Sequence, residues 1–162
     1  YNTAIMIDRN GELAGKYRKV SLPREEIEGG VTPGVSFPVF KTDFGTVGMM
    51  ICWDVTFPEA ARTLAFHGAE VILMPIWGGE LTLAKARALE NQVYLVSSSY
   101  SMKSAIFGLD GEIIKEATSD SPIAVVEVDL NKRKYWPWLG DLKNRIRREV
   151  PPKEALDFYQ PD

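Results

Sequence analysis

The stretch MICWDVTFPE, residues 50–59, contains the only cysteine of the 162-residue chain and marks a change of secondary structure. It overlaps the end of a β-prone run, residues 46–51, which predicts a strand. Pro58 suits the first turn of a helix, and Glu59 suits the positive N-terminal end of that helix. The apolar face of the predicted helix comprises Ala60, Ala61, Leu64 and Ala65. Cys52 therefore stands between a strand and a helix.

The segments on either side predict further strands and helices. Upstream, residues 3–8 and 12–20 form a hairpin across an Asn-Gly turn. A second hairpin pairs residues 37–41 with residues 46–51, after a Pro- and Gly-rich acidic loop over residues 22–34. Downstream, the pattern predicts helices over residues 58–67 and 81–91, strands over 71–74, 93–98 and 123–128, and a hairpin over 106–114. This order predicts an α/β fold with layers of helices and a mixed sheet.

Length and composition are typical of a soluble globular domain. The hydrophobic fraction is 45% and the charged fraction is 25%. A chain of this length can bury a core without disulfides or metals. We expect one α/β domain over residues 1–130 and a basic C-terminal extension over residues 131–162 that contacts other subunits.

Charge and cysteine content argue against several function classes. The formal net charge of −3 gives no reason to expect a nucleic-acid partner, and no apolar run is long enough to predict a membrane span. A single cysteine excludes an intrachain disulfide, so we expect a cytoplasmic location. Cys52 and His67, the only histidine, cannot form a zinc site of the Cys/His type, and we expect no metal or other cofactor.

Position alone leaves two roles open for Cys52. At the carboxyl end of a strand, a thiol lies where catalytic groups gather and near the positive end of the next helix, which favours the thiolate. Free cysteine is also among the most buried residue types, and position alone favours the role of a small apolar residue in a gap over a catalytic one. His67 does not fit the role of its base, because about ten helical residues, on the order of 15 Å, separate it from the start of that helix. His67 instead fits a C-terminal cap.

A lysine with a carboxylate is another way to support a thiol nucleophile. An ammonium group can stabilise the oxyanion that forms when a thiolate attacks a carbonyl or nitrile carbon. Lys16 and Lys19 lie in one segment with the carboxylates of Glu25, Glu26 and Glu28. Each of these charges, taken alone, fits a solvated face or loop better than a catalytic site.

An ordered set of short motifs resembles the carbon–nitrogen hydrolase (nitrilase) superfamily. The set runs from residue 1 to about residue 130 in the order found in that family, and the order makes the resemblance specific. The motifs are YNTA (1–4), DRNG (8–11), GKYRKV (15–20), LP (22–23), TPG (32–34), FG (44–45), MICWD (50–54), FPE (57–59), GAEVI (68–72), RA (87–88), EN (90–91), VY (93–94) and GLDGE (108–112).

The resemblance implies a fold and a catalytic set. The fold is an αββα sandwich with mixed sheets, whose N-terminal elements have no counterpart in this sequence. Cys52 matches the cysteine that attacks an amide, carbamoyl or nitrile carbon and forms a thioester, which water then converts to the acid. Lys19 matches the lysine that stabilises the oxyanion together with the backbone N–H that follows the cysteine, here that of Trp53.

The resemblance also bears on the substrate and on a second glutamate. In the family this glutamate lies in the loop after the lysine; Glu26 is our choice, and Glu25 and Glu28 also fit the spacing. Cys-Trp-Asp followed by Phe-Pro-Glu is closer to the amidase-like branches, which favours a small amide or N-carbamoyl substrate over a nitrile. Trp53 and Trp77 stand near strand ends and are candidate substrate-binding residues, although both also fit a core.

The general-base glutamate of the family lies on an early segment without a counterpart here. Such a base typically contributes about 10²–10⁴-fold. We therefore expect the parent protein to be an active hydrolase and residues 1–162 alone to be inactive or nearly so. The alternative is a non-catalytic oligomerisation or binding module with a degenerate nitrilase fold. Because the superfamily commonly forms oligomers, we expect a homo-oligomer. A helix motif of the family, with a mainly structural role, is matched by Arg87, Glu90 and Asn91.

Overall fold

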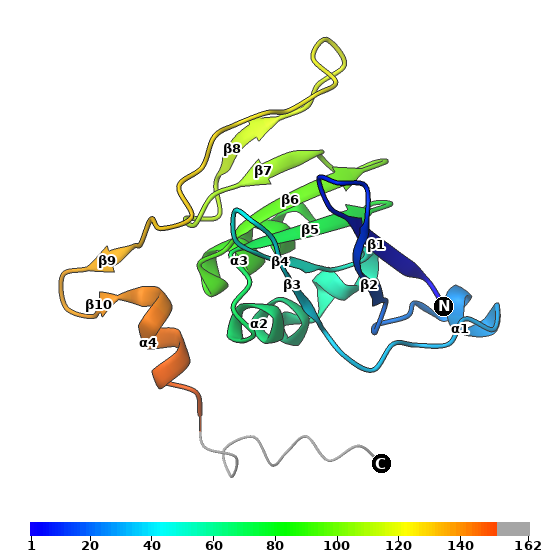
Figure 1. Cartoon of the computed structure of the whole chain (residues 1–162), viewed down its shortest axis with the longest axis horizontal. Helices are drawn as coiled ribbons and strands as arrows, with labels where there is room; N and C mark the ends of the chain where they lie inside the picture. The colour runs from blue at the N-terminus through cyan, green and yellow to red at the C-terminus, as the bar shows by residue number, and fades with distance from the viewer. Residues whose placement is uncertain (152–162) are drawn as a thin grey trace. The chain divides into compact units, whose positions relative to one another are not determined.

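A mixed sheet of six strands forms the centre of residues 1–131 (Figure 1). The computed structural model describes residues 1–151 and places a boundary between two compact units after Asn131. The strand order is β3-β4-β5-β6-β7-β8, in which β4, β5 and β6 run parallel to one another and the other pairs are antiparallel. The elements of this unit are β1 (Thr3–Ile7), β2 (Leu13–Arg18), α1 (Arg24–Glu28), β3 (Val39–Lys41), β4 (Thr46–Met49), the 3-10 helix η1 (Cys52–Thr56), α2 (Pro58–Phe66), β5 (Val71–Ile76), α3 (Leu81–Asn91), β6 (Tyr94–Ser99), β7 (Ala105–Phe107) and β8 (Ile113–Glu116).

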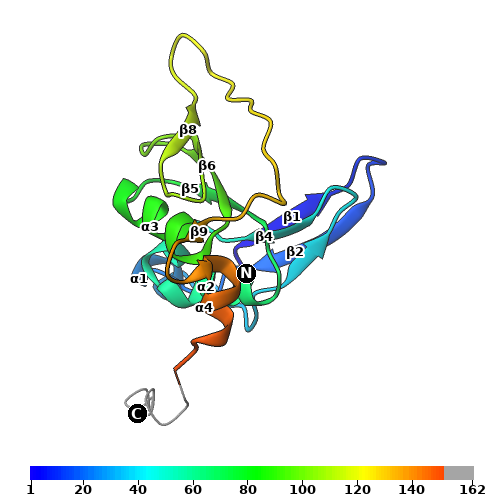
Figure 2. The same cartoon turned by 90° about the vertical axis from the view of Figure 1, so that its left-hand side faces the viewer.

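Helices α2 and α3 connect the parallel strands and cover one face of the sheet, as Figure 2 shows. Parallel pairs require such crossovers, and the alternation of strands and helices predicted from the sequence is confirmed. Ile72, Met74 and Leu95 are fully buried in the core that this face shares with the helices. Gly48 allows α2 to approach β4 closely, because a Cβ at this position would lie 2.9 Å from a methyl group of Leu64.

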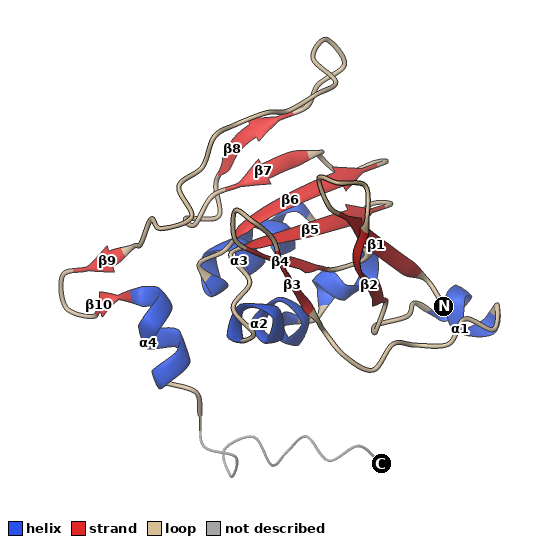
Figure 3. Cartoon of the chain, in the orientation of Figure 1, coloured by secondary structure: helices blue, strands red, loops and turns tan. Residues whose placement is uncertain are grey.

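The hairpin of β1 and β2 packs on the opposite face of the sheet (Figure 3). Its turn has the predicted form, since Gly11 takes a positive φ of 83° and the Asp8 carboxylate accepts hydrogen bonds from two backbone N–H groups of the turn. Tyr17 of β2 forms a second buried cluster with Met49 and Ile51. The described residues thus supply a helix layer and two β layers of the αββα sandwich.

The strand predicted over residues 123–128 is wrong. This segment makes no strand ladder, although its side chains still alternate between exposed and half-buried. Ile123 and Val125 are 73% and 77% exposed. The pattern that predicts a strand describes one chain only, whereas a strand also needs a hydrogen-bonding neighbour, and the described residues provide none here.

The second unit, described from residue 132 to residue 151, is more regular than predicted. It contains β9 (Tyr135–Trp136), β10 (Gly140–Asp141) and α4 (Leu142–Arg148), where the sequence predicts irregular structure. Asp141 caps α4 by accepting hydrogen bonds from the N–H groups of Lys143 and Asn144, which is the usual role of aspartate before a first helical turn. The rest of the predicted extension, residues 152–162, lies outside the described residues.

The helix lengths and the arrangement of side chains in residues 1–151 bear on membranes and metals. No helix there has the length and apolar character required to cross a membrane. No group of three or more His, Cys, Asp or Glu side chains is arranged there to hold a metal ion.

Candidate active site

Cys52 occupies a strained turn between β4 and α2. The structure inserts η1 where the sequence predicts a direct passage from strand to helix, and Cys52 is the first residue of η1. Its φ of 47° lies in the left-handed region, which is unfavourable for a non-glycine residue. Strained backbone of this kind is concentrated at functional sites, where the surrounding structure holds it in place. The half-buried thiol therefore has the backbone geometry expected of a functional residue rather than of a gap-filling one.

Lys19 is held rigidly beside a carboxylate. Its side chain is 1% exposed, and its Nζ lies 2.7 Å from Oε2 of Glu26. Its backbone N–H donates to the Asn2 carbonyl at 2.9 Å, and its carbonyl accepts from the Gly34 N–H at 2.7 Å. Residue 34 must be glycine for this approach, because a Cβ there would overlap the carbonyl oxygen of Arg18.

Among the three candidate glutamates, Glu26 is the one that contacts Lys19. Glu26 lies in α1, and its second oxygen accepts a hydrogen bond of 2.7 Å from the side-chain amide of Asn2. Glu25 is exposed, and Glu28 pairs with Arg24 on the protein surface. The structure therefore separates three residues that the spacing of the sequence does not distinguish.

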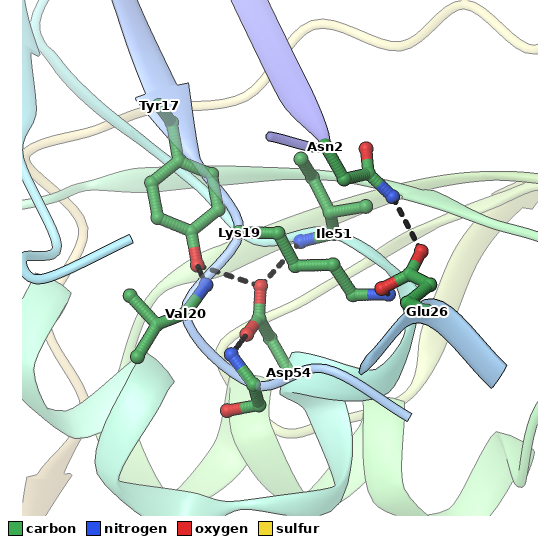
Figure 4. Close-up of polar contacts among 8 residues, drawn as sticks. Asn2, Tyr17, Lys19, Val20, Glu26, Ile51 and Asp54 are labelled. Atoms are coloured by element: carbon green, nitrogen blue, oxygen red, sulfur yellow. Dashed lines mark hydrogen bonds and ion pairs between the residues drawn. The ribbon is translucent and has the colours of Figure 1, made fainter. Parts of the chain in front are cut away.

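Asp54 connects the Cys52 turn to the Lys19 loop, as Figure 4 shows. Its side chain is fully buried. It accepts hydrogen bonds from the Tyr17 hydroxyl at 2.7 Å, the Ser21 N–H at 2.9 Å and the Ile51 N–H at 2.8 Å. Burial, and then the adjacent Asp54 carboxylate, raise the pKa of Tyr17 well above its usual range, so the Tyr17 hydroxyl remains a hydrogen-bond donor.

His67 and Lys16 lie away from this network. His67 follows the last residue of α2 as predicted, and its Nδ1 lies 2.9 Å from the carbonyl oxygen of Phe37. Lys16 is an exposed residue of β2. Of the two lysines considered from the sequence, only Lys19 enters the buried network with Glu26.

Trp53 and Trp77 are both exposed, by 42% and 69%, so the alternative that they fill the core is wrong. Trp53 follows Cys52 and contacts the edge of Phe57. Trp77 stacks on Tyr100, with ring centroids 4.6 Å apart and planes 5° from parallel. Trp77 and Tyr100 directly follow β5 and β6, and Cys52 is the third residue after β4. Because these strands are parallel, all three residues lie toward the same edge of the sheet.

A cleft of about 460 Å³ lies at the other end of the sheet and is not part of this site. It opens between the tip of the β1–β2 hairpin and the first residues of the parallel strands, Val47 and Val71. Cys52 lies beyond the opposite end of β4. Volume alone therefore does not indicate where the chemistry occurs.

Three residues of the site escape prediction from the sequence. Asn2 and Asp54 belong to the motifs that resemble the superfamily, but nothing local indicates their contacts, which join residues 24 to 37 positions apart. Tyr100 lies in a Ser-rich segment without a motif. An aromatic residue shortly after a predicted strand was the available signal.

Comparison with known proteins assigns the chain and its fold to one family. The family model described as carbon-nitrogen hydrolase matches residues 1–137. The chain therefore belongs to the carbon–nitrogen hydrolase family, as the motifs of its sequence predict.

The relatives include nitrilases and amidases. The chain is 37% identical over 150 residues to a probable nitrilase of Schizosaccharomyces pombe, covering 83% of this chain and 55% of that protein. It is 38% identical over 155 residues to a nitrilase of Pyrococcus abyssi, covering 82% of this chain and 57% of that protein. The human omega-amidase NIT2 is 29% identical, with 98% of this chain and 64% of that protein covered. The chain thus spans about half to two thirds of the length of these relatives.

Solved structures of the same superfamily confirm the fold. Saccharomyces cerevisiae Nit3 matches with a TM-score of 0.65 at 31% identity, covering 72% of this chain and 49% of that one. An amidase from Nesterenkonia sp. AN1 matches with a TM-score of 0.63 at 29% identity, covering 70% and 51%. That amidase structure shows the Michael addition of acrylamide at the active-site cysteine.

Proposed function

We propose that this chain carries the nucleophile and the oxyanion-stabilising lysine of a thiol hydrolase that cleaves the carbon–nitrogen bond of a small amide or N-carbamoyl compound. The supporting observation is that hydrogen bonds of one buried residue, Asp54, join the strained turn at Cys52 to the loop that holds Lys19 on Glu26. The omega-amidase relatives and the Nesterenkonia amidase support an amide substrate.

The reaction proceeds through a thioester. The Cys52 thiolate attacks the carbonyl carbon, and the Lys19 ammonium stabilises the resulting oxyanion together with the backbone N–H of Trp53. The carbon–nitrogen bond then breaks, and the nitrogen leaves as ammonia or amine after it takes up a proton. Water attacks the thioester carbon, the carbon–sulfur bond breaks, and the acid and the free thiol are released.

We further propose that residues 1–162 alone form the thioester from an activated substrate but do not turn over amides. The two carboxylates of the network are already engaged by hydrogen-bond donors. Glu26 binds Lys19 and Asn2, and Asp54 accepts three hydrogen bonds. A proton taken up by either carboxylate from the thiol or from water would displace one of these donors, which argues against either of them as the general base.

Acetylation by p-nitrophenyl acetate tests this function, because p-nitrophenolate leaves without needing a proton. We expect a stoichiometric burst of p-nitrophenolate, an acetyl group on Cys52 in peptide mass spectrometry, and no ammonia from simple amides or N-carbamoyl compounds. Cys52→Ala serves as the control and should give no burst. A wild-type chain without a burst would refute the nucleophilic role, and ammonia release that disappears in Cys52→Ala would refute the proposed inactivity.

A non-catalytic oligomerisation or binding module is the second candidate function. The hairpin of β1 and β2 exposes Ile5, Ile7 and Leu13 by 61%, 51% and 62%, and apolar side chains gathered on one element favour a contact surface. The acetylation experiment decides between the two candidates, since a binding module has no need of a reactive thiol. Assembly into homo-oligomers, which this surface also favours, and a cytoplasmic location remain part of our proposal.

The Trp77–Tyr100 stack is proposed to bind the acyl part of the substrate. Trp77→Ala or Tyr100→Ala should raise the half-saturating concentration of a p-nitrophenyl ester with an aromatic acyl group about 3–10-fold, the range expected for one lost aromatic pair. The maximal burst rate should stay the same, because neither ring contacts the reacting atoms. Trp138→Ala is the matched control, since Trp138 is 72% exposed and belongs to the other unit. An equal half-saturating concentration in wild type and in all three variants would contradict this role.

A further inference from the structure

Asp54 occupies the centre of the hydrogen-bond network in Figure 4. We propose that Asp54 is a positioning residue of the reaction, whose carboxylate joins the strained turn at Cys52 to the loop that carries Lys19. This role rests on the proposed function and goes beyond it, because it gives a part in the reaction to a residue outside the set of cysteine, lysine and glutamate.

The first element of this role is the turn itself. The Ile51 N–H donates to Oδ2 of Asp54 at 2.8 Å, and the Asp54 N–H donates to the Ile51 carbonyl at 3.1 Å. These two bonds close a ring around the turn that contains Cys52. A left-handed φ such as that of Cys52 persists only where the surroundings over-determine it. The hydrogen bond between the Ile51 N–H and the Asp54 carboxylate is one such constraint on the turn.

The second element is the loop on both sides of Lys19. Tyr17, two residues before Lys19, donates its hydroxyl proton to Oδ2 of Asp54 at 2.7 Å. Ser21, two residues after Lys19, donates its backbone N–H to Oδ1 at 2.9 Å. The Tyr17 hydroxyl in turn accepts from the Val20 N–H at 3.1 Å. One carboxylate therefore determines where the Lys19 loop lies relative to the turn at Cys52.

The chemistry of the site favours positioning over other roles for Asp54. Its oxygens already accept three hydrogen bonds inside a fully buried environment, so a proton taken up by either oxygen would displace a donor. A negative charge near a thiolate repels it, so the charge of Asp54 does not itself assist the nucleophile. The benefit that remains is geometric: the carboxylate fixes the loop that carries Lys19 relative to the turn that carries Cys52.

The electrostatic environment of the Cys52 thiol, measured in the full chain by its alkylation rates, tests this role. Cys52 is the only cysteine, so its alkylation by anionic iodoacetate and by neutral iodoacetamide can be measured without interference. In the proposed function the Lys19 ammonium acts on the same reacting centre as the sulfur, and a positive charge there favours the anionic reagent. Asp54→Asn retains the shape of the side chain, but its amide NH₂ group would face a backbone N–H donor. The loop that carries Lys19 should therefore move. We expect the ratio of the iodoacetate rate to the iodoacetamide rate to fall about fivefold.

Lys19→Met should lower the ratio of the iodoacetate rate to the iodoacetamide rate by a similar factor. This variant separates the inference about Asp54 from the proposed function on which it rests. An unchanged ratio in Lys19→Met would refute the pairing of Lys19 with Cys52 and the role of Asp54 with it. A ratio that falls in Lys19→Met but stays constant or rises in Asp54→Asn would refute the role of Asp54 alone. A rise is the result expected if Asp54 acts only through its charge.

Two further variants complete the test. Tyr17→Phe removes the hydroxyl between Asp54 and Val20 and should lower the ratio to a smaller extent, which keeps the inference testable if Asp54→Asn does not fold. Asp43→Asn is the matched control, because Asp43 is an exposed aspartate paired with Arg9, and its ratio should equal that of wild type. Urea unfolding is measured in parallel. A lower stability with an unchanged ratio would make Asp54 a merely structural residue and overturn the inference.

Discussion

Lys19→Met is expected to slow the acetylation of Cys52 by p-nitrophenyl acetate about 10²–10³-fold, the usual effect of losing one donor to an oxyanion. The substitution removes the ammonium group but fills most of the space that the lysine stem occupies. Glu26 does not become an isolated buried charge, because it is partly exposed and still accepts a hydrogen bond from Asn2. The loss should therefore appear in the rate of the burst, measured by stopped-flow absorbance, rather than in folding.

Lys16→Met provides the control for that experiment. Lys16 lies in the same strand region but is exposed, so its removal should leave the burst rate at the wild-type value. If Lys19→Met also reacts at the wild-type rate, backbone N–H groups alone stabilise the oxyanion. The catalytic lysine of the proposed function would then be wrong.

The helices and parallel strands could be predicted because local signals mark their ends. The helix predicted over residues 58–67 is α2, which starts at Pro58 and ends at Phe66, and the helix predicted over residues 81–91 is α3. Pro58 lacks the N–H that a first turn cannot use, and Gly68 follows the C-terminal end with a φ of 103°. Such signals act within one or two residues of the position that they determine.

Features that depend on distant residues could not be predicted in the same way. The segment 123–128 has the side-chain alternation of a strand, but the presence of a ladder depends on which chain lies beside it. The left-handed backbone of Cys52 gives no sequence signal, because such a conformation is expected at glycine or asparagine rather than at cysteine.

The residues of the site also fall into two groups, those that sequence motifs predict and those that depend on contacts with distant residues. Family motifs make Cys52 and Lys19 candidates, because the order of the motifs is specific. Spacing could not choose among the glutamates of the loop, since α1 places adjacent side chains in different directions and only the contacts with Lys19 and Asn2 distinguish Glu26. The contacts of Asp54 span 33 and 37 residues and become visible only when β2 and η1 lie side by side.

Arg87→Met is expected to lower the free energy of unfolding by about 2–4 kcal/mol, mainly because two backbone carbonyl groups lose their hydrogen-bond donor. Arg87 is 5% exposed and belongs to the helix motif whose role the sequence indicates to be structural. Its Nε donates to the Val55 carbonyl at 3.0 Å, and its Nη2 donates to the Thr56 carbonyl at 3.2 Å. Its Nη1 lies 2.9 Å from Oε1 of Glu90. Methionine retains much of the volume but leaves two carbonyl groups and one carboxylate without this donor.

Urea unfolding followed by tryptophan fluorescence measures this loss, with Arg24→Met as the matched control. Arg24 also pairs with a glutamate of its own helix, but its side chain is 85% exposed, so its removal should change stability by less than about 1 kcal/mol. Equal losses in both variants would show that Arg87 contributes no more than a surface pair. Because Val55 and Thr56 end the 3-10 helix that Cys52 begins, a folded Arg87→Met sample should also acetylate more slowly than wild type. A normal burst rate in that sample would show that the first turn of η1, with its bonds to Asp54, is sufficient to hold the nucleophile.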